Sequence, residues 1–154
     1  MKNTLSISIR QYNNHDLEPI AVMFDAYRQF YQQPPNMALA KSFIAARFKN
    51  QDSVILVAEN LDKKLIGFCQ IYPSFCSVAA AKIGVLYDLF VDSSNRKTGA
   101  GRALMLASHE YAANNGMARL DLSTAKNNHA AQALYESLGW VRDDVFYMYS
   151  KNIT

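Results

Sequence analysis

The sequence predicts a protein of the α/β (α+β) class, with helices flanking one central sheet. Segments with the two-residue period of a strand alternate along the chain with segments that have the period of a helix. The stretch from Ile83 to Val91 is apolar almost throughout, which is typical of a strand covered on both faces. The 154 residues contain no repeat, low-complexity tract or linker, so we expect a single domain spanning residues 1–154.

The first half of the chain is predicted to contain a strand, two helices and a hairpin. Apolar and polar residues alternate from Leu5 to Gln11, and apolar residues recur at helical spacing from Leu17 to Tyr27. Asn14 and Asp16 can cap this first helix, and Pro34 with Pro35 breaks it. The next predicted elements are a helix from Ala38 to Phe48 and strands from Ser53 to Glu59 and from Leu65 to Tyr72, the last ended by Pro73.

The second half is predicted to continue with two helices and two strands after the apolar strand. These elements are a helix from Arg102 to Asn114 closed by Asn115 and Gly116, a strand from Arg119 to Thr124, a helix from Asn128 to Leu138 ended by Gly139, and a closing strand from Val145 to Ser150. The closing strand is apolar and is expected near a sheet edge, where it invites pairing with another chain. We therefore expect a homodimer.

Composition argues against several classes of partner. The net charge is +3 and the basic residues are scattered, which disfavours a nucleic-acid partner. The segment from Met1 to Ser8 lacks the features of a signal peptide, and no 18-residue apolar run exists, so we expect a cytoplasmic protein without a membrane partner. Cys69 and Cys76 have no second pair and no nearby His, which indicates neither a disulfide framework nor a metal site.

A basic, glycine-bearing segment from Arg96 to Arg102 joins the apolar strand to a predicted helix. Its glycines let backbone NH groups turn inward, and a helix N-terminus attracts anions, so the segment is suited to phosphate. A Walker loop is excluded because Arg102 and Ala103 stand where Lys and Ser or Thr are required. A dinucleotide fingerprint is disfavoured by Leu104 and by the four strands that precede the segment. A tight turn without a ligand is the other alternative.

Two motifs, in the right order, resemble the GNAT superfamily of N-acetyltransferases. Arg96, Gly99 and Gly101 match its coenzyme A loop, which has Arg or Gln, two residues, Gly, one residue, and Gly or Ala. The second motif is formed by Asn128, Ala131, Leu134, Tyr135, Gly139 and Trp140. The resemblance implies a mixed, mostly antiparallel sheet of about six to seven strands, splayed between strands 4 and 5 and flanked by about four helices. Three stretches resemble the histone and polyamine acetyltransferase branch: Asp25 to Gln33, Gly67 to Ser77 and Leu86 to Val91.

The resemblance implies acetyl-coenzyme A as co-substrate and no metal. It assigns the backbone of Leu89, Phe90 and Val91 to the pantetheine arm and the thioester oxygen, which a backbone NH can stabilise as it becomes an oxyanion. Asn128 and Ala131 would lie against the coenzyme, with Tyr135 near its sulfur. The pyrophosphate would be held beside Arg96 by the NH groups of Lys97, Thr98, Gly99, Ala100, Gly101 and Arg102.

Two residues are candidates for proton transfer. The phenol of Tyr135 can protonate the leaving thiolate, although an aromatic residue on this helix can also serve packing alone. Asp88 is a carboxylate inside an apolar strand, which is costly unless the residue has a role or a partner. We interpret it as the base or binding group for the amine, with a structural pairing as the alternative. Tyr87 stands where polyamine enzymes of this branch often carry a second polar or acidic residue.

The predicted function is acetyl transfer from acetyl-coenzyme A to a primary amine by direct attack in a ternary complex. The acceptor would be a small-molecule or peptide amine, namely a polyamine, an amino acid or a lysine side chain. Arg28 could instead bind a substrate carboxylate, which would favour an amino acid or a peptide. A coenzyme A-binding regulatory module without activity and a protein-interaction domain are the alternatives. The predicted acceptor wall is formed, with Asp88, by Tyr27, Arg28, Tyr31, Gln70, Tyr72 and Phe75.

Overall fold

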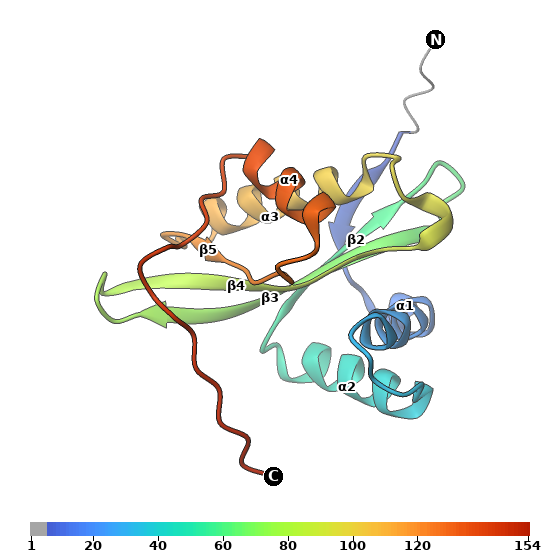
Figure 1. Ribbon diagram of the computed structural model, residues 1–154. Coiled ribbons are helices and arrows are strands. Elements are labelled where there is room, and N and C mark those ends of the chain that lie inside the picture. Colours follow the sequence, from blue (N-terminus) through green and yellow to red (C-terminus); the bar gives the residue numbers. More distant parts are fainter. Residues whose placement is uncertain (1–5) are drawn as a thin grey trace. The chain divides into compact units, whose positions relative to one another are not determined.

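The computed structural model describes residues 6–154 and divides into two compact units, the first ending at Leu122 and the second spanning Ser123–Thr154 (Figure 1). Leu5, the start of the first predicted strand, lies outside the described residues. The prediction of a single domain stays a prediction. The elements of the first unit are β1 (Ser8–Gln11), a short 3₁₀ turn (Asn14–Asp16), α1 (Leu17–Phe30), α2 (Met37–Asn50), β2 (Val54–Glu59), β3 (Leu65–Cys76), β4 (Ala81–Val91), a second 3₁₀ turn (Ser93–Asn95), α3 (Ala100–Asn114) and β5 (Leu120–Asp121).

The five strands form one mixed sheet in the order β1-β2-β3-β4-β5. The first four strands pair antiparallel with their neighbours, and β5 pairs parallel with β4. That last pairing is confined to Gly84 with Leu120 and Val85 with Asp121. Among the described residues, no strand pairs with the rest of this edge of β4, so the sheet opens beside Leu86 to Val91.

The prediction of about six to seven strands is wrong, because the sheet within residues 6–154 has five. The predicted strand from Arg119 to Thr124 is shortened to β5, since its remaining residues have no ladder partner on β4. The predicted closing strand from Val145 to Ser150 is not a strand in the structure. A segment counts as a strand only when its backbone pairs with a neighbour, and within residues 6–154 this segment has none.

Pro73 does not end β3, contrary to the prediction. The pairing of β2 with β3 stops at Ile71, so the following residues of β3 have an open edge on that side. Pro73 lies opposite Gly84 within the continuing β3–β4 hairpin, which extends to Cys76. Proline is tolerated in a strand where its missing NH would face such an open edge.

The helices of the first unit cover both faces of the sheet (Figure 1). On one face, Ile20 and Phe24 of α1 and Ile44 of α2 pack in a core cluster with Val57 and Phe68 of the sheet. On the other face, the cluster of α3 contains Ala100 and Leu104 together with Leu56, Ala58, Ile66 and Cys69. Neighbouring residues of β2 thus point to opposite cores, as the two-residue period of a strand requires.

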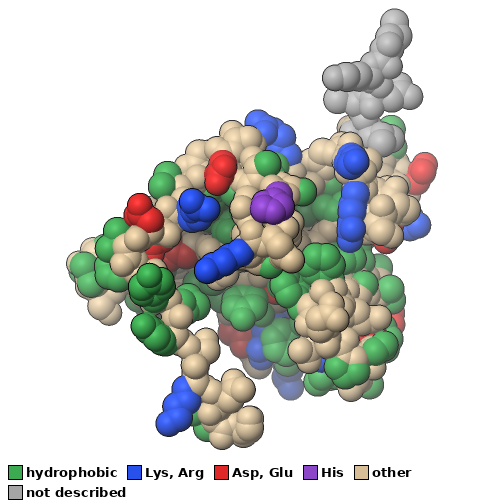
Figure 2. Space-filling view, viewed as in Figure 1, with side chains coloured by type: hydrophobic (Ala, Val, Ile, Leu, Met, Phe, Trp, Pro, Cys, Tyr) green, Lys and Arg blue, Asp and Glu red, His purple; other side chains and the backbone are tan. Residues whose placement is uncertain are grey.

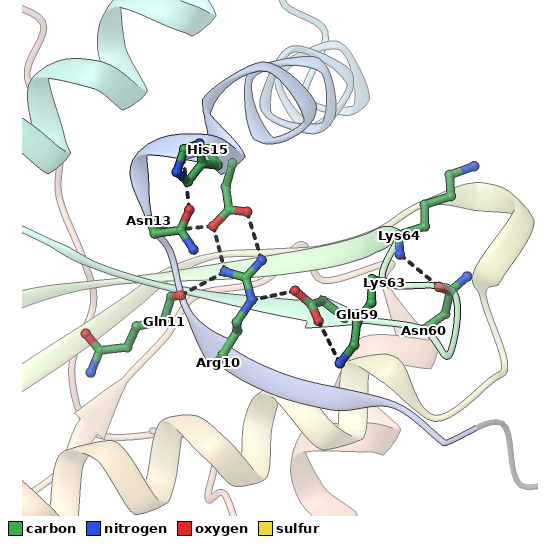
Figure 3. Close-up of polar contacts among 9 residues, drawn as sticks. Arg10, Gln11, Asn13, His15, Glu59, Asn60, Lys63 and Lys64 are labelled. Atoms are coloured by element: carbon green, nitrogen blue, oxygen red, sulfur yellow. Dashed lines mark hydrogen bonds and ion pairs between the residues drawn. The ribbon is translucent and has the colours of Figure 1, made fainter.

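Arg10 of β1 ties the edge of the sheet to the start of α1 (Figure 3). Its guanidinium donates two hydrogen bonds to Asp16, at 2.7 and 2.9 Å, and one to Glu59 of β2 at 2.5 Å. Burial by itself would raise the pKa of Asp16, but the hydrogen bonds from Arg10 and from the Asn13 NH lower it overall. Asn13 accepts from the His15 NH, which completes a capping box.

In the second unit, α4 (His129–Ser137) is capped by the side chain of Asn128, and Gly139 follows with a φ of +86°. The residues after Trp140 have no regular secondary structure. Hydrophobic side chains on this C-terminal segment are exposed (Figure 2). They include Val141, Val145, Phe146, Tyr147, Met148, Tyr149 and Ile153, each exposed by 73% or more.

Three further features of residues 6–154 bear on the function. No group of three or more His, Cys, Asp or Glu side chains is arranged to hold a metal ion. No helix in the described part of the chain is long and apolar enough to cross a membrane. Cys69 is buried, Cys76 is half-buried, and both are free thiols. The expected absence of a metal cofactor stays a prediction.

Candidate functional site

A pocket of about 230 Å³ opens among α1, α2, β3 and β4 in the first unit. Its wall is mostly aromatic, with one carboxylate and one guanidinium. The lining residues are Phe24, Tyr27 and Arg28 of α1, Leu39 and Phe43 of α2, Tyr72 of β3, and Tyr87 and Asp88 of β4. This composition fits a small ligand with apolar surface and one or two charged groups.

A β-bulge in β4 shapes the pocket. Gln70 of β3 pairs with Asp88, and the next residue, Ile71, pairs with Leu86, so Tyr87 is an extra residue in the ladder. In a regular strand, neighbouring residues point to opposite faces. Because the bulge re-aims the side chains, both Tyr87 and Asp88 line the same pocket.

Asp88 is 2% exposed, and the pKa of its carboxyl group is shifted toward neutral pH. Burial raises the pKa of Asp88 to about 6, and the hydrogen bond from Gln70 Nε2 offsets only part of that rise. Within residues 6–154, no Lys, Arg or His side chain forms an ion pair with it. The group therefore titrates near the pH at which an acid–base catalyst works best.

The hydrogen-bond partner of Asp88 is itself fixed. Gln70 is fully buried, and its Nε2 donates to Asp88 Oδ2 at 2.6 Å. The hydroxyl of Ser53 donates to Gln70 Oε1 at 2.7 Å, which holds the amide with its nitrogen toward the carboxylate. Gln70 was predicted to contact the acceptor, but the structure places it behind Asp88, where it positions that group.

Two phenols flank the carboxylate. The hydroxyl of Tyr27 donates to the backbone carbonyl of Tyr87 at 3.1 Å. Burial, and to a smaller extent the charge of Asp88, raises the pKa of Tyr27 and of Tyr72. Both phenols are therefore neutral at physiological pH and can donate hydrogen bonds, and neither competes with Asp88 as a base.

The predicted acceptor residues divide into two groups. Tyr27, Arg28, Tyr72 and Asp88 line the pocket together. Tyr31 does not line it but packs against the Tyr27 ring at a centroid distance of 5.1 Å. Phe75 lies in the outer half of the β3–β4 hairpin and is 77% exposed.

Four further lining residues were not predicted: Phe24, Leu39, Phe43 and Tyr87. Phe24 and Phe43 lie on the helical stripes that pack the core, so periodicity alone assigns them to packing, whereas Leu39 is 47% exposed. A signal for Tyr87 was present, because it stands directly beside Asp88, the charged residue of an otherwise apolar stretch from Ile83 to Val91.

The segment from Arg96 to Arg102 leads into the N-terminus of α3. Lys97 and Gly99 have positive φ values of 61° and 93°, and a side chain at Gly99 would meet nothing within 4 Å, so conformation rather than space favours glycine there. Thr98 donates its hydroxyl to the Asn95 carbonyl at 2.6 Å. The turn is thus held in a fixed conformation before the helix begins.

α3 begins without a side-chain cap, whereas Asn36 caps α2. Its first intrahelical bond runs from the Ala103 NH to the Gly99 carbonyl at 2.9 Å, so the NH groups of Ala100, Gly101 and Arg102 precede it. No acidic residue lies in the first turn. An uncapped N-terminus with exposed Arg96, Lys97 and Arg102 beside it fits an anionic group such as a pyrophosphate.

The other predicted coenzyme residues lie in both units. Leu89, Phe90 and Val91 are half-buried on the open edge of β4, and Arg96 Nε donates to the Val91 carbonyl at 3.4 Å. In the second unit, Asn128 Oδ1 accepts from the Ala131 NH at 3.3 Å. The ring of Tyr135 is half-buried and lies 6.2 Å from the ring of Trp140.

Comparison with known proteins agrees with this geometry. Residues 20–140 match the Acetyltransferase (GNAT) family. The chain is 42% identical over 147 residues to the "Uncharacterized N-acetyltransferase YhfO" of Bacillus subtilis (strain 168), covering 96% of this chain and 98% of that protein. A solved structure of a probable acetyltransferase is 30% identical, with a TM-score of 0.89 over 96% of this chain and 98% of the other. The chain therefore belongs to the GNAT family and is an acetyl-coenzyme A-dependent acetyltransferase.

Proposed function

We propose that the enzyme transfers the acetyl group to a primary amine that binds in the pocket above Asp88. The observation that carries this proposal is a nearly buried carboxylate without a cationic partner, at the base of an aromatic pocket. A carboxylate in that position attracts an ammonium group, and the amine supplies the ion-pair partner that Asp88 lacks. The aromatic rings of Tyr72 and Tyr87 add a surface that favours a cation.

The proposed reaction is a direct attack in a ternary complex. Asp88, ionised above a pKa of about 6, accepts a proton from the bound ammonium, and the free amine attacks the thioester carbonyl carbon. A C–N bond forms, the C–S bond breaks, and the thiolate leaves with the electron pair of that bond. The nitrogen, positively charged after the attack, loses its second proton to water and becomes the neutral amide. Backbone NH groups on the open edge of β4 would stabilise the oxyanion that forms between these two steps.

The residues of the first unit fit acetyl-coenzyme A. The uncapped N-terminus of α3 and the basic residues Arg96, Lys97 and Arg102 would hold its pyrophosphate. Leu89 to Val91 would hold the pantetheine arm along the open edge of β4. When bound, the coenzyme supplies the activated acetyl group, and these contacts orient it.

Tyr135 is the proposed proton donor. The phenol of Tyr135 would protonate the departing thiolate, while Trp140 packs beside its ring. Asn128 and Ala131 would lie against the coenzyme. Because the Asn128 side-chain oxygen already caps α4, any contact that it makes with the coenzyme would use its amide nitrogen.

The similarity to the histone and polyamine branch stays a prediction. Among the described residues that line the pocket, Asp88 is the one acid, which matches a single ammonium group better than a polycation. A relative in Kocuria rhizophila is named a mycothiol acetyltransferase and is 30% identical over 129 residues. The aligned region covers 79% of this chain and 42% of that protein. We therefore favour a small amine as acceptor.

A screen of acceptors tests this function. Purified enzyme would be given acetyl-coenzyme A and a panel of polyamines, amino acids and lysine peptides, with release of the coenzyme A thiol as the readout. We expect acceptor-dependent release with at least one small primary amine. Binding of acetyl-coenzyme A without release for any member of the panel would contradict the proposal and favour a regulatory module.

A further inference from the structure

Arg28 has hydrogen-bonding capacity that the described chain does not use. Its side chain is 17% exposed and lines the same pocket as Asp88. Nη1 of Arg28 is buried and has no hydrogen-bond partner within residues 6–154. A buried charged donor without a partner is costly, so such a group is expected to have a ligand in the working state of the protein.

The nearest carboxylate does not satisfy this guanidinium. Asp25 Oδ1 lies 3.6 Å from Arg28 Nη1, which is too far for a hydrogen bond. Asp25 is already engaged, because Oδ1 accepts the Asn36 NH at 2.9 Å and Oδ2 accepts from Gln29 Nε2 at 3.1 Å. Asp25 thus fixes the connection between α1 and α2, and Arg28 is left facing the pocket.

The remaining features of the pocket limit the ligand to one chemical class. A volume of about 230 Å³ is below the range for drug-sized ligands, which indicates a compact molecule. Its wall offers one anion, Asp88, one cation, Arg28, and otherwise aromatic and aliphatic surface. A molecule complementary to this wall has an ammonium group, an anionic group and an apolar body.

We propose that Arg28 binds a carboxylate of the acceptor, so that the acceptor is a free amino acid or a similarly small amino carboxylic acid. The guanidinium presents paired donors that match a carboxylate, while Asp88 receives the amine of the same molecule. This assignment rests on the proposed function of the pocket. It makes Arg28 a specificity-determining residue, because an amine without the acid group leaves the guanidinium unpaired.

Matched pairs of acceptors test the assignment. Each pair consists of an amino acid and the amine that lacks only its carboxylate, such as phenylalanine with phenethylamine, tyrosine with tyramine and lysine with cadaverine. For the wild-type enzyme we expect kcat/KM to be about 10-fold to 100-fold higher for the acid of the preferred pair. In R28Q the ratio should fall to about one, and R28K, which keeps the charge but loses the planar fork, should lie between.

Arg47 provides the matched control. It lies on α2 with 23% of its side chain exposed and does not line the pocket. Its Nε is also buried without a hydrogen bond in the described chain, although it lies 2.9 Å from Asp52 Oδ1 as an ion pair. R47Q should keep the wild-type preference for the acid. Affinity for acetyl-coenzyme A should be unchanged in R28Q, which shows that the variant is folded.

The outcomes separate this inference from the function on which it rests. A wild-type enzyme that acetylates amines with no preference for the acid would overturn the role of Arg28 and leave the proposed function standing, and so would an R28Q enzyme that keeps the full preference. Failure to acetylate any acid or amine would overturn both. The wild-type ratio is informative even if a variant does not fold.

Discussion

Among single residues, Asp88 is central to the proposed reaction because its buried environment disfavours the charged form of the carboxyl group. Its pKa is raised from 3.8 to about 6, so the folded protein binds this proton more tightly than the unfolded chain does. Stability contributed by the protonated group is present below pH 4 and is lost as pH rises from about 4 to about 6. At pH 7.5 the ionised group therefore lowers the free energy of unfolding, by on the order of 3 kcal/mol.

The Asp88→Asn variant should be more stable than wild type at pH 7.5 and much less active. The new side chain can still accept from Gln70 Nε2, but it carries no charge to bury and cannot take a proton. We expect the acceptor kcat/KM to fall by about 100-fold or more, with acetyl-coenzyme A affinity retained. Denaturant unfolding and steady-state kinetics measure the two effects, and a variant less stable than wild type would instead indicate a structural role.

The pH profile gives a second measure of the same residue. If Asp88 accepts the proton, the wild-type acceptor kcat/KM should have a limb near pH 6 along which activity rises as the carboxylate ionises. That limb should be absent from the residual activity of Asp88→Asn. An identical limb in the variant would assign it to another group.

The Tyr135→Phe variant tests the proposed proton donor. Phenylalanine keeps the ring and its packing beside Trp140 but removes the hydroxyl. We expect the turnover number to fall by about tenfold to a thousandfold, with little change in stability and normal coenzyme binding. A loss below about threefold would remove the phenol from the mechanism, since water could then protonate the thiolate equally well.

Among the elements, α3 best allows the effect of a substitution on helix stability to be distinguished from its effect on coenzyme binding. Gly101→Glu adds a good helix former and a negative charge to the first helical turn, and both changes favour the helix itself. The same charge should repel the pyrophosphate and raise the dissociation constant of coenzyme A at least about tenfold, measured by calorimetry. Ala113→Glu, exposed in the last turn of α3, adds the same charge as a control and should leave the affinity unchanged. Equal affinities for the two variants would sink the assignment of the loop.

The elements also show what the sequence could predict. β2, β4 and α1 to α3 lie within a few residues of the predicted bounds, because their apolar residues recur with the period that the buried face demands. The bulge at Tyr87 and the burial of Gln70 behind Asp88 were missed, since both depend on the register between β3 and β4. The pocket was partly anticipated through Tyr27, Arg28 and Tyr72, whereas its aromatic wall was assigned to the core.

At the scale of the whole molecule, the C-terminal segment from Val145 to Ser150 has no partner strand within the described residues. Phe146, Tyr147 and Tyr149 are 81%, 89% and 90% exposed, although the surrounding sequence has strand character. Exposing so much apolar surface is unfavourable, so we propose that Val145 to Ser150 pairs with a second copy of the chain in a homodimer.

Light scattering after size exclusion tests the homodimer. The full chain should elute as a dimer. A variant that ends at Asp143 should be monomeric or should dimerise much more weakly. Replacing Tyr147 by Arg should weaken the dimer without removing the backbone. A full chain that stays monomeric at concentrations well above those used in the kinetic experiments would contradict the proposal.

The most direct measurement follows the acetyl group itself. Acetyl-coenzyme A with a deuterated acetyl group would be incubated with the enzyme and the best primary amine from the screen, and the products identified by mass spectrometry. The proposed function predicts deuterated N-acetyl product in equal amount to the coenzyme A released, with both formed about 100-fold more slowly in Asp88→Asn. Release of coenzyme A without acetylated amine, or acetylated amine at an undiminished rate in Asp88→Asn, would contradict acetyl transfer to an amine held by Asp88.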